Sequence, residues 1–509
     1  MHRLALVTVT VRPSGVAIVS LNRADKYNGL SLPMFREIES AALSLKEDPS
    51  IRAVVLTGSG RGFCAGLDVP SMIQIGPSAV RTLLTRADGR SDNLAQSVGY
   101  AWRQLRVPVF AAIHGVCFGG GLQIALGTDM RFATAEAKMS IMEMKWGLIP
   151  DMSGSVTLRE VVPMAVAKQL SWTAQIISGE RAAAIGLVSH LSSDPLQAAT
   201  EYAESLGLHS AEAAAECKRR MLADRAARFS LISASQRPRH SADLTLSEVG
   251  RPIEVHTSKM RVSVASGVAT LTLPSVESDV LDVCTQLAAD ASVRVVVLQF
   301  EEPASSQPLH PASATADAFR RLPMPVIAVL DKPLTLHASV ASLGADVRIG
   351  SSRAAFNFGR ESAEANVPSA LLLRLSELGG AAAAAKASAG PSTVHAHEAA
   401  SLGLLMLDED ALACASKLAA EISGMSPVSV TGVKELFQST WHADEPSSLA
   451  TECRIQSAIL PSGLPSWNVV SCAASNLLLP KWLRLPFGPR AHMRLLPLPH
   501  SPPATRSNL

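Results

Sequence analysis

Cysteine is scarce in this chain, and long hydrophobic runs are missing. The seven cysteines form no C-x-x-C pair and have no regular spacing, which favours reduced thiols over a disulfide framework. No apolar run reaches the ~18–20 residues that a membrane-spanning helix needs. A strand pattern begins at Leu4, which leaves no room for a signal or transit peptide. We therefore expect a soluble, intracellular protein without a membrane span.

An excess of charge of one sign is also missing. The chain has 46 Lys and Arg residues against 44 Asp and Glu residues, so nothing indicates a nucleic-acid surface. Residues 58–62 are rich in glycine and follow a predicted strand. However, the third glycine of Gly-x-Gly-x-x-Gly is misplaced and no helix pattern begins after them. We expect no nucleic-acid partner and no nicotinamide or flavin site, and we assign no metal ligands.

The most distinctive stretch that is present covers residues 108–154. The apolar run 109–113 predicts a strand that is buried on both faces. Three consecutive glycines, 119–121, then precede a segment with helical character. Glycines at such a junction let the backbone approach a ligand and leave amide N–H groups free to bind an oxygen that carries negative charge. A tight turn without any ligand is the alternative interpretation.

Three motifs in order resemble a known family. Residues 63–68 (FCAGLD) follow the predicted strand 52–57, residues 119–123 (GGGLQ) follow the strand 109–113, and residues 143–154 begin with a glutamate in an apolar segment. Together they resemble the crotonase family, the enoyl-CoA hydratase/isomerase superfamily, over about residues 5–230. Residues 21–30 resemble the early coenzyme A segment of that family. The resemblance implies an α/β fold, a ββα superhelix with its helices outside.

The second half of the chain repeats part of the first. Residues 325–329 (PVIAV) echo residues 108–112 (PVFAA), and the same offset of 217 pairs Asp129 with Asp346 and Arg131 with Arg348. At that offset the glycine triplet becomes Leu-His-Ala and the residue in place of Glu143 is Arg360. The sequence therefore predicts a tandem duplication whose second copy has lost its chemistry.

A chain of 509 residues is too long for one ordinary core, which agrees with this division. We predict a crotonase-like catalytic domain over 1–230, a linker over 231–259 and a degenerate crotonase-like domain over 260–445. Residues 446–509 are predicted to be a poorly ordered tail rich in Pro and Arg.

The resemblance implies an oxyanion hole made by two backbone amides, the N–H groups of Leu67 and Gly120. One such donor typically contributes about 3 kcal/mol to a transition state. The resemblance also implies substrate or coenzyme A binding by residues of the early segment and of the two glycine-containing loops. These residues are Arg23, Lys26, Ala65, Gly66, Asp68, Gly119 and Gly121. Arg23 and Lys26 could equally be plain surface charges.

Three side chains are candidates for catalysis. Glu143 lies among apolar residues that would raise its pKa, which suits a general base; a solvated glutamate is the alternative. The family's hydratases carry a second glutamate where this chain has Gln123, which could orient water or substrate or could simply face solvent. Asp151 matches an acid of the family's dienoyl-CoA isomerases, although it could also cap the helix that follows Pro150.

The preferred interpretation is an enzyme that shifts the double bond of an unsaturated fatty acyl-CoA through an enolate. One carboxylate can shuttle a proton alone, so isomerisation tolerates Gln123 better than hydration does. A 2-enoyl-CoA hydratase and a non-catalytic acyl-CoA-binding or scaffold protein are the alternatives.

Coenzyme A would enter as part of the substrate, with no separate cofactor. The family resemblance implies a trimer-based homo-oligomer. The C-terminal residues 507–509 (SNL) differ at one position from the peroxisomal address Ser-Lys-Leu, which leaves peroxisome and cytoplasm open.

Overall fold

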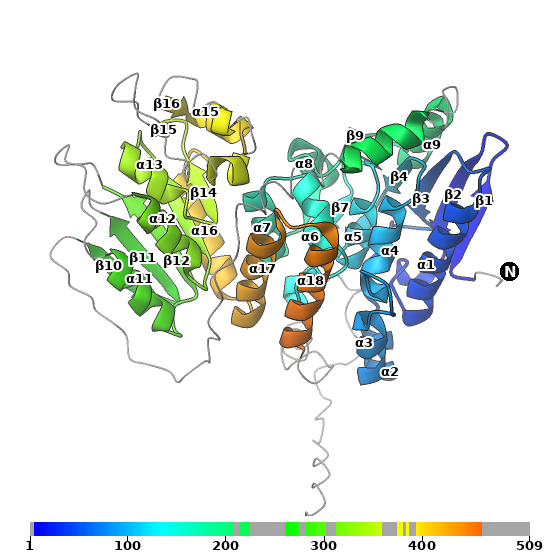
Figure 1. Cartoon of the computed structure of the whole chain (residues 1–509), viewed down its shortest axis with the longest axis horizontal. Helices are drawn as coiled ribbons and strands as arrows, with labels where there is room; N and C mark the ends of the chain where they lie inside the picture. Colours follow the sequence, from blue (N-terminus) through cyan, green and yellow to red (C-terminus); the bar gives the residue numbers. More distant parts are fainter. Residues whose placement is uncertain are drawn as a thin grey trace, which may run out of the picture.

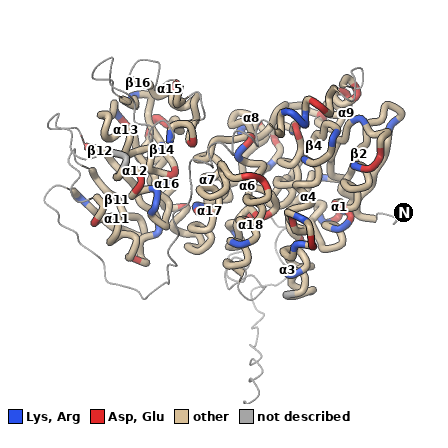
Figure 2. Tube along the Cα trace, in the orientation of Figure 1, with Lys and Arg blue, Asp and Glu red and all other residues tan. Residues whose placement is uncertain are grey.

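The computed structural model contains two α/β halves side by side, with a group of helices between them (Figure 1). It describes residues 5–206, 213–223, 260–273, 280–301, 312–358, 374–379, 383–385 and 393–460. The predicted linker 231–259, the C-terminal residues 507–509 and Arg360 lie outside these described residues. Basic and acidic residues are interspersed along both halves (Figure 2), in line with their nearly equal numbers.

The first half is built on a six-stranded sheet with the order β1-β2-β3-β4-β6-β9. β1 and β2 pair antiparallel, and the other neighbours pair parallel. The strands are β1 (Val7–Val11), β2 (Val16–Leu21), β3 (Ala53–Gly58), β4 (Val109–Ile113), β6 (Met130–Ala133) and β9 (His190–Leu191). A second sheet of three short strands contains β5 (Val116–Phe118), β7 (Lys138–Ser140) and β8 (Ile177–Ser178). The strand predicted at 109–113 is therefore confirmed as β4.

Helices cover both faces of this sheet, which is why β3 is buried along its whole length. Val54 and Leu56 face the main hydrophobic core, whereas Ala53 and Val55 face a smaller cluster under α9. The α-helices of this half are α1 (Leu32–Glu47), α2 (Val69–Ile75), α3 (Pro77–Leu84), α4 (Leu94–Arg103), α5 (Gly120–Leu126), α6 (Gly154–Thr157), α7 (Met164–Thr173), α8 (Gly179–Ala184) and α9 (Pro195–Leu206). This half also contains three 3-10 helices, η1 (Ala24–Lys26), η2 (Glu143–Trp146) and η3 (Leu158–Glu160), and residues 213–223 form a further helix.

The second half has a six-stranded sheet with a matching order, β10-β11-β12-β13-β14-β17. Its strands are β10 (Arg261–Ala265), β11 (Val268–Leu273), β12 (Val295–Phe300), β13 (Val326–Leu330), β14 (Val347–Gly350) and β17 (Met406–Leu407); β15 (Ala355–Asn357) and β16 (Thr393–His395) form a separate pair. Its helices include α11 (Val280–Ala289), α12 (Ala312–Arg321), α13 (Leu336–Ser342), α15 (Ala396–Ser401), α16 (Ala411–Ser423), α17 (Pro427–Thr440) and α18 (Glu445–Ile459).

Polar contacts recur at the sequence offset of 217. The Asp129 carboxylate accepts the N–H of Val109 at 2.8 Å, and that of Asp346 accepts the N–H of Val326 at 2.9 Å. The guanidinium of Arg131 donates to a carbonyl after α8, and Arg348 donates to the carbonyl at the matching place in the second half. The two halves thus repeat the same polar interactions as well as the same strand order.

The two last described helices, α17 and α18, pack against α7 and α6 of the first half (Figure 1). One hydrophobic core extends from the first half through α16, α17 and α18 to the second sheet. The predicted start of a poorly ordered tail at residue 446 is therefore wrong for residues 446–459, which form most of α18. None of the helices in the described part of the chain is long and apolar enough to cross a membrane.

Candidate active site

Two loops of the first half meet where the sequence predicts an oxyanion hole. A Cβ added to Gly66 would lie 3.5 Å from the amide nitrogen of Gly120, so the two loops are in close proximity. In the described part of the chain, neither the N–H of Leu67 nor that of Gly120 donates a hydrogen bond to another group. Two unused amides on adjacent loops can bind a carbonyl oxygen as negative charge develops on it.

The geometry of these loops depends on glycine. Gly66 has φ +85°, and an added Cβ would lie 2.7 Å from the carbonyl oxygen of Phe118. A Cβ on Gly121 would lie 2.6 Å from the carbonyl oxygen of Cys64. A side chain at either place would separate the two loops, because the atom that it meets belongs to the backbone.

Replacing Gly66 with alanine is expected to lower kcat roughly 100- to 1000-fold, the usual effect of losing an oxyanion donor. The cause is displacement of the Leu67 amide by the backbone clash with Phe118. Gly89→Ala is the matched control, since Gly89 also has a positive φ of +79° but has no atom within 4 Å of the added Cβ. Steady-state kinetics with an acyl-CoA substrate would measure kcat for both variants. An equal loss of kcat in Gly66→Ala and Gly89→Ala would contradict this role of Gly66.

Glu143 is the first residue of η2, and only 7% of it is exposed. Its Oε1 would lie 3.3 Å from a Cβ on Gly119, so the carboxylate lies against the glycine turn of the oxyanion loop. Its other oxygen, Oε2, is buried and has no hydrogen-bond partner among the described residues. Burial raises the pKa of Glu143 to about 7, although the hydrogen bonds that it accepts act in the opposite direction. The solvated glutamate that the sequence left open is not what the structure contains.

Gln123 is fully buried, so the interpretation that it faces solvent is wrong. Its Nε2 donates to Glu143 Oε1 at 2.6 Å, and its Oε1 accepts the N–H of Met152 at 2.9 Å. The amide therefore connects the candidate base to the loop after η2. It holds Oε1 of the Glu143 carboxylate, and Oε2 is the oxygen without a hydrogen-bond partner among the described residues.

Asp151 is partly buried and does not cap a helix. The next helix, α6, begins at Gly154, and the residue at its N-cap is Ser153. The pKa of Asp151 lies well above its usual value, because burial disfavours its charged form and the carboxylates of Glu143 and Glu452 repel a further negative charge. The raised pKa of Asp151 therefore favours its protonated form, in which the carboxyl group can donate a proton.

Comparisons with known proteins bear on this arrangement. The family model described as enoyl-CoA hydratase/isomerase matches residues 11–236. The putative enoyl-CoA hydratase/isomerase YngF of Bacillus subtilis (strain 168) is 31% identical over 215 residues, which are 42% of this chain and 80% of that protein. The chain belongs to the enoyl-CoA hydratase/isomerase family.

The names of other relatives state two different activities, a hydratase and an isomerase. Methylglutaconyl-CoA hydratase, mitochondrial, of Rattus norvegicus is 32% identical over 38% of this chain and 59% of that protein, so the chain spans less than two thirds of that relative. Delta(3,5)-Delta(2,4)-dienoyl-CoA isomerase, peroxisomal, of Arabidopsis thaliana is 34% identical over 35% of this chain and 65% of that protein. A crystal structure of a putative enoyl-CoA hydratase from Streptomyces coelicolor A3(2) has a TM-score of 0.40 and 29% identity, covering 46% of this chain and 86% of that chain.

The predicted coenzyme A residues of this family member are only partly at the surface. Arg23 makes an ion pair with Asp68 at 2.6 Å, which connects the early segment to the loop that carries Leu67. The N–H of Ala65 donates to the carbonyl of Tyr27 and makes a second link between the same two segments. Lys26 is exposed. Of the two cations predicted to bind coenzyme A, Arg23 thus pairs with a carboxylate of the protein. The binding roles of both stay predictions.

Among its described residues, the second copy shows no glycine turn at the place that matches α5. In place of the glycine before α5, Thr335 precedes α13, and its hydroxyl accepts the N–H of Ala338 at 3.3 Å. The residue at the position of Gln123 is Val340, which is buried among apolar side chains. A capped helix start and an apolar side chain thus take the places of the glycine turn and of the Gln123 amide.

The sequence interpretation missed the residues that the second half brings to the first-half site. Glu452 of α18 accepts the N–H groups of Ser153 and Ser155, and Gln456 accepts that of Ile149. These residues lie about three hundred positions after the loop that they bind, in a segment predicted to be a tail. No local pattern in the sequence marks them.

Proposed function

We propose that this protein shifts the double bond of an unsaturated fatty acyl-CoA by proton transfer through an enolate. Glu143 removes an α- or γ-proton, and the amides of Leu67 and Gly120 hold the thioester oxygen as it gains negative charge. The observation that carries the proposal is the buried, unpartnered Oε2 of Glu143, held against the glycine turn while Gln123 occupies Oε1.

Isomerisation is preferred because the site offers Glu143 and Asp151 as carriers of protons but an amide at position 123. An amide has no proton to exchange with water, and the oxygen of Gln123 already accepts the N–H of Met152. Isomerisation needs one proton removed and one returned, with no activated water. We expect coenzyme A to enter only as part of the substrate, and the trimer-based homo-oligomer stays a prediction.

A 2-enoyl-CoA hydratase is the second candidate. The similarity to methylglutaconyl-CoA hydratase favours it, whereas the similarity to the dienoyl-CoA isomerase favours the first. In the hydratase, Glu143 alone would activate the water and Gln123 would only orient it.

The test is an assay of the purified protein on 3-enoyl-, 3,5-dienoyl- and 2-enoyl-CoA, followed by ultraviolet absorbance. Migration of the double bond without addition of water would support the isomerase. Hydration of 2-enoyl-CoA without migration would refute it and establish the second candidate.

The pH dependence of kcat/KM is expected to reflect Glu143. A general base must be deprotonated, and burial raises the pKa of this carboxyl to about 7. The acid limb of the profile should therefore rise about tenfold per pH unit and end near that value. An acid limb at the usual pKa of a glutamate, about 4.3, would show that Glu143 is not the base.

A further inference from the structure

The loop after Glu143 is bound by side chains of the second half. Ser429 of α17 donates to the carbonyl of Gly147 at 2.6 Å, and Gln456 of α18 accepts the N–H of Ile149 at 3.2 Å. These two contacts hold the part of the loop that precedes Asp151. A loop whose backbone is bound on both sides of one residue has little freedom to move that residue.

Glu452 holds the part that follows Asp151. Its Oε2 accepts the N–H of Ser153 at 3.1 Å, and its Oε1 accepts that of Ser155 at 2.7 Å. Gln96 of α4 donates to the same carboxylate at 3.0 Å, and Glu452 has no exposed surface. Ser153 has φ +70°, a conformation that residues other than glycine rarely adopt, so the loop needs such external support.

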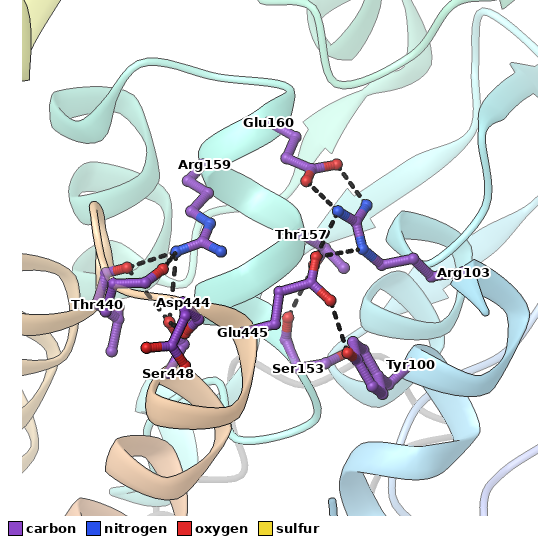
Figure 3. Close-up of polar contacts among 11 residues, drawn as sticks. Tyr100, Arg103, Ser153, Thr157, Arg159, Glu160, Thr440, Asp444, Glu445 and Ser448 are labelled. Carbon is purple, nitrogen blue, oxygen red and sulfur yellow. Dashed lines mark hydrogen bonds and ion pairs between the residues drawn. The ribbon is translucent and has the colours of Figure 1, made fainter. Parts of the chain in front are cut away.

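A separate set of contacts anchors α18 to the first half (Figure 3). Arg103 pairs with Glu445 at 2.6 Å and with Glu160 at 2.5 Å, and the hydroxyl of Tyr100 donates to Glu445 at 2.6 Å. Arg159 donates to the carbonyl of Thr440, at the end of α17, at 2.6 Å. These contacts fix where α18 starts, and Glu452 lies two turns further along the helix.

Resting on the proposed function, we propose that Glu452 is a positioning residue of the first-half active site. It is a carboxylate supplied by the degenerate half that fixes the loop so that Asp151 returns the proton to the enolate. In this cycle Glu143 breaks one C–H bond and keeps that proton, and Asp151 gives its own proton to form the new C–H bond. Proton exchange with solvent then returns Glu143 to its deprotonated form and Asp151 to its protonated form. The cycle therefore consumes and releases no proton overall.

The charge of Glu452 acts on the same residue as its hydrogen bonds. Two titratable groups reach Asp151 electrostatically, Glu143 from η2 and Glu452 from α18, and both favour its protonated form. The other side chains that form hydrogen bonds with this loop, Gln123, Ser429 and Gln456, carry no charge. Removing the charge of Glu452 should therefore make Asp151 lose its proton at lower pH.

The test is the pH profile of kcat for Glu452→Gln. We expect the alkaline limb, where Asp151 loses its proton, to move to lower pH while the acid limb of Glu143 stays in place. The plateau of kcat should fall by up to about 100-fold, because a misplaced acid forms the new bond poorly, with little change in KM. Glu452→Asp keeps the charge and should retain the wild-type limb; this variant also serves if the glutamine variant does not fold.

Glu445→Gln is the matched control. It weakens the anchor of the same helix at Arg103 and Tyr100 but makes no contact with the Asp151 loop. This variant should have a lower free energy of unfolding, but neither the acid limb nor the alkaline limb of the kcat profile should move. An unchanged profile in Glu452→Gln, or an equal shift in Glu445→Gln, would overturn the inference. If the wild-type protein hydrates 2-enoyl-CoA instead of isomerising, the proposed function is refuted but the role of Glu452 is not. Hydration also returns a proton to the enolate, so the pH profiles of kcat can still be measured for both variants.

Discussion

Replacing Glu143 with glutamine is expected to abolish turnover while acyl-CoA binding persists. Glutamine keeps the shape of the side chain and can still accept the hydrogen bond from Gln123, but it cannot take a proton. A general base typically contributes 100- to 10 000-fold, so kcat should fall by roughly that factor. Steady-state kinetics and equilibrium binding of an acyl-CoA, measured on the same preparation, separate the two effects.

The control for this change is Glu180→Gln. Glu180 is an exposed residue in the first turn of α8, and it has no part in the site. Its replacement should leave both kcat and binding unchanged. Full activity of Glu143→Gln would remove Glu143 as the base, and loss of acyl-CoA binding would assign it to binding instead of proton transfer.

Replacing Asp346 with alanine is expected to lower the free energy of unfolding by about 3–5 kcal/mol. Asp346 is fully buried between Lys168 of the first half, at 2.6 Å, and Lys434 of α17, at 2.8 Å. The two lysines hold the pKa of Asp346 down at about 2 against its burial, so the carboxylate is charged at neutral pH. Without it, two buried ammonium groups would remain with no counter-charge, at the place where the halves join.

Asp129→Ala is the matched control, because Asp129 is the equivalent residue of the first half. It pairs with Lys218 at 2.8 Å, but 32% of its side chain is exposed and it binds only one lysine. We expect a clearly smaller loss of stability in urea-induced unfolding followed by circular dichroism. A loss for Asp129→Ala as large as that for Asp346→Ala would contradict the importance of the buried triad.

The second half binds the loop of the first half that carries Asp151. It lacks the open glycine turn, yet its last helices cover the loop that carries Asp151 and bury their apolar side chains in the core of the first half. The two halves thus share one hydrophobic core.

Short-range patterns were sufficient for the sequence to predict much of the first half. The strand at 109–113 and the helix after the glycine triplet were recognisable because apolar residues and glycines lie next to each other in the chain. The candidate base was recognisable for the same reason, since the apolar neighbours of Glu143 are also those that bury it.

The family, the glycine loops and the candidate base Glu143 could be predicted from the chain alone, because each prediction depends on residues that are neighbours in the sequence. Three features became visible only in the folded protein: Gln123 bridges Glu143 and Met152, Asp151 caps no helix, and Glu452 reaches the loop beside Asp151. Those outcomes depend on how α17 and α18 pack on the first half. Contacts across about three hundred residues arise from the packing of whole helices, and no local spacing encodes them.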